Sequence, residues 1–162
     1  MKIHLIKPDM ADQLVMGKTS GRNCRNRKRR GKSQLGMCVC GGAKLLCSFG
    51  MAPSSLVVLP QNRVISTMPV ANIMDNKPLV NVMPFGMCSS PANPTVAAAT
   101  AAALGVLTPM PCIPVIPAPW VPGSATVMIA NCPALNQTAK LMCAWGGVIQ
   151  IIDPGQMTIQ IT

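Results

Sequence analysis

The chain of 162 residues is long enough for one ordinary domain with a sizeable core and too short for two large domains. Its formal net charge of +10 comes with one His, four acidic residues and no Glu, so general acid and base catalysis has few candidates and we expect no enzyme. Two Phe, two Trp and no Tyr leave Val, Ile, Leu, Met and Ala to build the core.

Residues 1–40 form a basic N-terminal extension. They hold most of the Lys and Arg of the chain, whereas residues 41–162 have very few charged side chains. Lys7, Pro8 and Asp9 interrupt the apolar start before it reaches the length of a signal peptide, so we expect no classical secretion. No apolar period runs through the rest of the extension, which predicts a flexible segment.

Seven basic residues of the extension are candidate partner-binding residues. They could attract an acidic protein or an anionic membrane surface, and a plain solvated linker is the alternative. No aromatic side chain lies between them to stack on a base, so no nucleic acid partner is expected. The seven residues are Arg22, Arg25, Arg27, Lys28, Arg29, Arg30 and Lys32.

Residues 41–162 have the pattern of a mainly β domain built from short hairpins. Runs rich in Val and Ile alternate with Pro, Gly and Asn, and the nearby prolines favour short, edge-like strands. Charged side chains are so scarce here that we expect partners to cover much of the surface. The runs are "SSLVVLP", "NRVISTMPV", "PLVNVMP", "ATVMIANCP", "GGVIQIIDPG" and "MTIQIT".

One short helix is predicted over residues 94–104. Asn93 suits the N-cap, Pro94 suits the first turn, and the alanines that follow favour helix. Gly105 fits just past the end, and Pro109 prevents the helix from resuming. The apolar run at this helix is about 12 residues long, where a membrane span needs about 20.

An eight-residue segment is repeated in the chain, and we call its two copies the octets. The segment "AKLLCSFG" at residues 43–50 returns as "AKLMCAWG" at residues 139–146. Each copy places a cysteine between an apolar run and an aromatic-glycine pair. Either the chain contains two related structural units, or two strand-turn units use the same favourable turn chemistry.

Eight cysteines are present, and none of them has the Cys-x-x-Cys spacing. Four of them occur in the octets or after Pro-rich and Gly-rich turns that could direct a sulfur inward: Cys47, Cys88, Cys112 and Cys143. Four thiolates would suit a closed, tetrahedral zinc site. Buried free thiols are an alternative of similar weight, and two disulfides are a third.

Five segments together resemble the PAAR-like family of spike-tip proteins in type VI secretion and related contractile injection systems. Their order matches over roughly residues 41–156, and nothing comparable covers residues 1–36. The segments are "GAKLLCSFGMAPSSLVVLPQNRV", "ANIMDNKPLVNVMPFGMCSSPANP", "AAALGVLTPMPCIP", "PALNQTAKLMCAWGGVIQI" and "DPGQ".

The resemblance implies a small, tapered PAAR-like β cone over residues 41–162. Its blunt base would cap a trimeric VgrG-type spike, and its point would contact a target membrane transiently. The repeated octets would present similar edges to the threefold partner. The N-terminal extension could attach an effector or accessory subunit. Assembly would take place in the bacterial cytoplasm, followed by secretion at the tip of the apparatus.

The metal is where this chain departs from the resemblance. Related PAAR cones often hold zinc with histidines, whereas the only histidine here is His4, outside the matched region. One structural zinc ion would therefore need the four cysteines Cys47, Cys88, Cys112 and Cys143. The alternative function is a thiol redox or zinc-binding adaptor that uses the cysteines and the basic extension.

Overall fold

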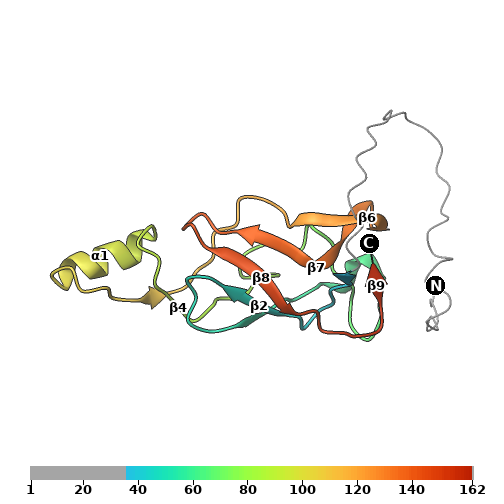
Figure 1. Ribbon diagram of the computed structural model, residues 1–162, viewed down its shortest axis with the longest axis horizontal. Helices are drawn as coiled ribbons and strands as arrows, with labels where there is room; N and C mark the ends of the chain where they lie inside the picture. The colour runs from blue at the N-terminus through green and yellow to red at the C-terminus, as the bar shows by residue number, and fades with distance from the viewer. Residues whose placement is uncertain (1–35, 162) are drawn as a thin grey trace, which may run out of the picture.

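The computed structural model describes residues 36–161, which form an elongated molecule that narrows toward one end (Figure 1). The described chain is mainly β with one α-helix, as predicted. The strands are β1 (Gly36–Met37), β2 (Lys44–Cys47), β3 (Ser54–Ser55), β4 (Met87–Cys88), β5 (Met110–Pro111), β6 (Val121–Ile129), β7 (Cys132–Met142), β8 (Val148–Asp153) and β9 (Gln160–Ile161); the helical elements are the 3-10 turn η2 (Pro60–Asn62) and α1 (Pro94–Ala102).

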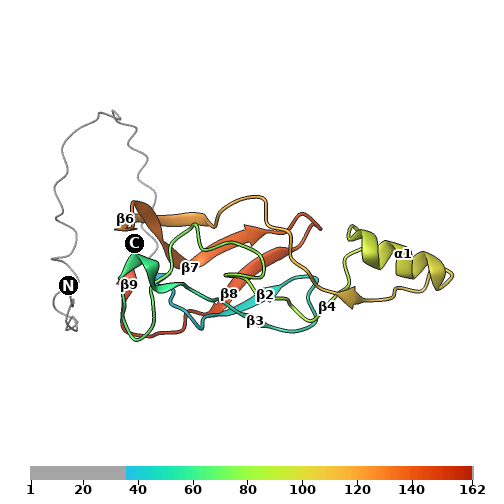
Figure 2. The same cartoon turned by 180° about the vertical axis from the view of Figure 1, so that it is seen from behind.

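The largest sheet of the described chain has five antiparallel strands in the order β3-β2-β8-β7-β6. Two small ribbons lie at opposite ends of it (Figure 2). The ribbon of β1 and β9 lies at the broad end, where the described chain begins and finishes. The ribbon of β4 and β5 lies at the narrow end and leads into α1. The broad end and the narrow end are therefore built from different segments of the chain.

The two octets lie on opposite sides of the same strand, β8. Cys47 in the first octet and Leu141 in the second are both paired with Ile149. Both copies bury their Ala, Leu and Cys positions and expose the residues between them, apart from the half-buried Leu46. This alternation is what two strands need when they pack one face on a common core. The repeat thus serves two neighbouring strands of one sheet.

Two apolar cores fill the molecule. The larger one lies under the five-stranded sheet and contains the fully buried Phe85 and Trp120. The smaller one lies at the broad end, where Val70 and Ile129 pack with Ile161 of β9. Trp120 also donates a hydrogen bond of 3.0 Å from its indole nitrogen to the Asp75 carbonyl, so its polar group is satisfied in the interior.

Two of the predicted strand runs do not become named strands. Residues 62–70 and 78–84 make only isolated bridges, such as Ile65 with Pro69 and Leu56 with Val82. Pro69, Pro78 and the other prolines of these runs lack the N–H that a regular ladder requires. Both segments are therefore held as irregular loops over the sheet.

The folded body begins earlier than the predicted boundary at residue 41. Gly36 and Met37 pair with β9, and Val39 and Cys40 are completely buried. Apolar side chains in such a position stabilise the domain, so residues 36–40 belong to it rather than to the extension. The short run that carries them has no periodicity from which a strand could be predicted.

The helix begins where its cap predicts and ends slightly early. The Asn93 side chain accepts a hydrogen bond of 3.1 Å from the Thr95 N–H, and Pro94 occupies the first turn. The helix ends at Ala102 rather than at residue 104, because the chain turns through Leu104 and Gly105, both at positive φ. No helix in the described part of the chain is long and apolar enough to cross a membrane.

Candidate functional site

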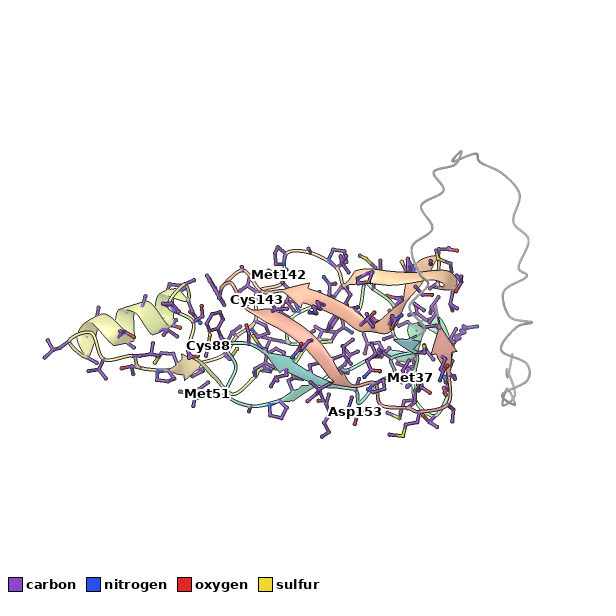
Figure 3. All side chains as sticks on the ribbon, viewed as in Figure 1. Met37, Met51, Cys88, Met142, Cys143 and Asp153 are labelled. Atoms are coloured by element: carbon purple, nitrogen blue, oxygen red, sulfur yellow. The ribbon has the colours of Figure 1, made fainter. Side chains whose placement is uncertain are left out.

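The four predicted metal-ligating cysteines lie close to one another near the narrow end. Cys47 ends β2 and Cys88 ends β4, whereas Cys112 and Cys143 directly follow β5 and β7. All four are buried in the larger core. Figure 3 labels Cys88 and Cys143 at the junction between the sheet and the helical end. We call these four residues the thiol cluster.

Local backbone geometry explains why the sulfur atoms converge. The Cys112 N–H donates a hydrogen bond of 2.7 Å to the Gly86 carbonyl, which holds β5 beside β4. A Cβ at Gly147 would lie 2.9 Å from the Cys47 sulfur, so only glycine lets the turn after β7 pass so close to it. The sequence analysis did not identify Gly147 as a site residue. The only local feature that could have indicated it is its place as the second glycine of the "WGG" run.

Burial raises the pKa of the Cys112 thiol to about 11, and its neighbours Cys88 and Cys47 contribute to the rise. Burial is also the main cause of a raised pKa at Cys47, which Cys143 and Cys88 increase further, while the N–H groups of Phe49 and Gly50 lower it. These mutual effects require neighbouring sulfurs. At neutral pH the thiols of Cys47 and Cys112 are therefore protonated, and a metal would have to displace protons to bind them.

The remaining described cysteines lie elsewhere. Cys38 and Cys40 are buried in the smaller core at the broad end, and Cys132 is half-buried in the β6–β7 hairpin. Burial, with a smaller effect from Cys40, raises the pKa of Cys38 to about 12. All seven described cysteines are free thiols in the structure. Cys24 and the seven predicted partner-binding residues, Arg22 to Lys32, lie outside the described residues.

Metal coordination by the thiol cluster stays a prediction. In residues 36–161, no group of three or more His, Cys, Asp or Glu side chains is arranged to hold a metal ion. The chemistry of the donors nevertheless fits zinc, because four thiolates form one of the usual closed, tetrahedral structural sites. The thiol cluster thus supplies suitable ligands that the structure brings close together.

The broad end carries a second candidate site, an exposed apolar surface. Ile65, Met68, Met128 and Met157 are exposed side chains that lie within a few residues, along the chain, of members of the smaller core. They come from three separate segments: the loop that returns to Val70, the β6–β7 hairpin and the loop before β9 (Figure 2). We call these four residues the broad-end surface. Scattered exposed apolar residues are common, but a group contributed by three segments is typical of a protein interface.

A buried glutamine stabilises this end. The Gln156 amide nitrogen donates hydrogen bonds to the Cys38 carbonyl at 2.6 Å and the Ile159 carbonyl at 2.9 Å. Its side-chain oxygen accepts hydrogen bonds of 2.8 Å from the N–H groups of Thr158 and Ile159. Gln156 therefore holds β1 to the segment before β9, and it lies in the "DPGQ" segment noted in the sequence.

The fold and the two sites define an elongated, mainly β protein with a buried thiol cluster toward one end and an apolar surface at the other. Residues 39–156 match the family described as a domain of unknown function (DUF4280). Because the match covers most of the chain, the protein belongs to this family. No curated protein and no solved structure matches the chain.

Proposed function

We propose that this protein is a non-enzymatic spike-tip protein of a type VI or related contractile injection system. Its broad end caps a trimeric VgrG-type spike, and its narrow end sharpens the spike for puncture of a target membrane. The resemblance of five ordered segments to PAAR-like proteins motivates this proposal. The elongated β body with an apolar surface at its broad end is the structural observation that supports it.

The broad-end surface is the part of the molecule that docks on the spike. Ile65, Met68, Met128 and Met157 could each bury apolar area against a partner, and apolar contacts of this kind dominate stable interfaces. The described chain has only six charged side chains, so little charge has to be desolvated on docking. A threefold spike would meet this end and leave the narrow end free.

Co-purification with a trimeric VgrG-type spike tests the docking. The double variant Ile65→Asp with Met68→Asp should weaken binding at least tenfold, because it places two charges in an apolar interface. Leu104→Asp with Leu107→Asp, which adds the same two charges at exposed apolar positions of the opposite end, is the matched control and should bind as the native chain does. Absence of native binding, or equal loss in both variants, would contradict the proposal.

The basic residues Arg22 to Lys32 recruit an effector or an accessory subunit in this scheme. The described chain begins at Gly36 in the broad end, and the seven basic residues precede Gly36 by four to 14 positions in the sequence, so they are tethered to that end. Attraction between exposed charges weakens with salt. Replacing the seven basic residues by Gln should abolish the salt-sensitive binding of that partner and leave spike docking unchanged.

The thiol cluster holds one structural zinc ion as part of this proposal. Cys47, Cys88, Cys112 and Cys143 would be its ligands, and the metal would supply a cross-link between four turns where the core is narrow. Single Ser substitutions in the cluster should remove about one zinc per chain and lower Tm, whereas Cys132→Ser should do neither. If the native protein contains no metal, or if Cys132→Ser has the same effects as the cluster variants, the zinc site is contradicted and the four cysteines are buried core thiols.

A thiol redox or zinc-binding adaptor is the second candidate function, because the same cluster could carry it. The raised pKa values of Cys47 and Cys112 disfavour the redox form of this function, since the reactive species is the thiolate. Titration of free thiols against zinc content separates the candidates. Rapidly titrating thiols in a protein without zinc would favour redox chemistry over the structural metal.

A further inference from the structure

We propose that α1 and the loop that returns from it form an apolar wedge that inserts into the acyl region of a lipid bilayer. We call residues 91–115 the α1 projection. It extends beyond the sheet as a separate arm at the narrow end (Figures 1 and 2). The inference deepens the proposed function by naming the element that meets lipid, and it rests on that function only for delivery of the arm to a membrane.

The α1 projection combines strong exposure with a complete absence of charge. Leu104 is 97% exposed, and Val106, Leu107, Ile113 and Val115 are also exposed. Residues 78–139 contain no Asp, Glu, Lys, Arg or His. A protruding surface of this kind is unfavourable in water and favourable in hydrocarbon. Isolated exposed leucines are ordinary, but an entire uncharged arm is not.

The three hydroxyl groups of the arm each make a hydrogen bond within it. The Thr95 hydroxyl donates to the Asn93 side chain at 2.8 Å, and the Thr108 hydroxyl donates to the Val106 carbonyl at 3.0 Å. The Thr100 hydroxyl accepts a hydrogen bond of 3.2 Å from the Thr108 N–H. A polar group that brings its partner along loses little on leaving water, so transfer of these residues into lipid is not strongly opposed.

A protein partner would leave a different pattern on this arm. Protein interfaces are enriched in Tyr, Trp, Phe, Met and Arg at the centre, and they have a polar rim that fixes orientation. The exposed residues of α1 are mostly small alanines, and the loop adds Leu, Val and Ile without an aromatic or charged side chain. Such a surface offers no specific partner groups and matches the uniform apolar interior of a membrane.

The base of the arm is fixed to the β body by the two octets. The Phe49 carbonyl of the first octet accepts a hydrogen bond of 3.0 Å from the Ser89 N–H. The Trp145 carbonyl of the second accepts a hydrogen bond of 2.5 Å from the Ser90 hydroxyl. On the returning side, the Ala144 N–H donates to the Val115 carbonyl at 2.8 Å. The arm is therefore attached to the body by hydrogen bonds at both of its chain connections.

The length of the arm suits one leaflet. Nine helical residues span about 14 Å, whereas the hydrocarbon core of a bilayer is about 30 Å thick. A helix this short leaves N–H and C=O groups at its ends without intrahelical partners, so these groups have to stay near headgroups and water while the apolar side chains enter the leaflet. Entry into one leaflet, rather than a full crossing, is the expected mode.

The test uses the full chain and vesicles of pure phosphatidylcholine at about 0.15 M salt. Neutral lipid and salt suppress attraction of the basic extension to the membrane. Flotation should recover the native chain with the vesicles, and the double variant Leu104→Asp with Leu107→Asp should bind at least tenfold less. The matched control is the double variant Met74→Asp with Leu79→Asp, which adds the same two charges at exposed loop positions outside the arm. It should bind within about twofold of the native chain.

The outcomes separate this inference from the proposed function. A native chain that binds the spike but no neutral vesicles overturns the lipid wedge alone. Vesicle binding without spike binding contradicts the spike-tip function and leaves the wedge supported. Equal loss in the two Asp variants, or loss of a protein partner with unchanged vesicle binding in Leu104→Asp with Leu107→Asp, also overturns the wedge. Unchanged thermal unfolding of the variants excludes misfolding as the cause of lost binding.

Discussion

Gln156 is a buried polar residue with an unusual number of partners at the broad end. Replacement by Leu keeps the volume but leaves the Cys38 carbonyl and the N–H groups of Thr158 and Ile159 without their partners. The cost of unpaired buried groups predicts a loss of about 3 kcal/mol in the free energy of unfolding. Urea unfolding measures it. Gln160→Leu, at an exposed position of β9, is the matched control and should change stability by less than about 0.5 kcal/mol.

Two buried cysteines of the smaller core give the domain an alkaline limit. Burial raises the pKa of Cys38 to about 12 and that of Cys40 to about 11, whereas the ordinary value is 9.0. Below pH 9 both folded and unfolded chains hold these protons, so the full stability is present. Above pH 9 only the unfolded chain releases them, and stability falls as the pH rises toward 11 to 12.

The urea midpoint between pH 8 and pH 11 checks this expectation. The native chain should lose stability steadily above pH 9. Cys38→Ala should flatten part of that fall, because it removes the thiol whose pKa burial raises most strongly, to about 12. A midpoint that stays constant to pH 11, or an identical slope in the variant, would show that the buried thiols do not control the alkaline limit.

The β6–β7 hairpin carries backbone strain at its turn. Ala130 and Asn131 connect the paired Ile129 and Cys132, with φ values of 49° and 62°. A two-residue turn with positive φ at both positions favours Asn and Gly, and Ala is a poor choice for it. Ala130→Asn should therefore raise the free energy of unfolding by about 0.5 to 1 kcal/mol. An unchanged or lower Tm in this variant would contradict the assignment of strain.

The elements that the sequence predicts well are those with local signals. The helix over residues 94–104 was predicted from Asn93 and Pro94, whose cap hydrogen bond and first-turn position are local chemistry. The strands β8 and β9 lie within predicted runs of Val and Ile, and the second half of β6 overlaps another. In contrast, β2 contains Lys and Leu and β7 also contains Ala, residues that favour helix, and both form strands by pairing with the two edges of β8.

The two candidate sites were predictable to different degrees, because only the thiol cluster carries local sequence signals. The octets identified Cys47 and Cys143, and turn chemistry added Cys88 and Cys112, so the members of the thiol cluster could be named from the sequence. The broad-end surface could not, because Met68, Met128 and Met157 come from distant segments that only tertiary packing brings to one end. Gln156 was equally hidden, since a polar residue in a loop carries no sign of burial.

At the scale of the whole molecule, the two candidate sites lie at different ends. The broad end combines the chain ends, the smaller core and an apolar surface, whereas the narrow end combines the thiol cluster and an uncharged arm. The octets connect the two parts, because their strands lie in the sheet and their aromatic-glycine turns hold the arm. A protein that docks at one end and meets lipid at the other requires this separation.

The folded body begins at β1, and two shortened chains test this boundary. A chain that starts at residue 36 keeps β1 and the buried Val39 and Cys40, so its Tm should stay close to that of the full chain. A chain that starts at residue 41 loses the partner of β9 and opens the smaller core, because Val70 and Ile161 lose neighbours. Loss of two fully buried side chains predicts destabilisation by about 3 kcal/mol or more.

Thermal unfolding of the two shortened chains and of the full chain shows where the folded body begins. Retained stability from residue 36 together with a large drop from residue 41 places the boundary at β1. Spike co-purification of the same proteins adds a functional measurement, since the broad-end surface is built on the smaller core. If the chain from residue 41 were as stable as the full chain and docked equally well, residues 36–40 would belong to the extension after all.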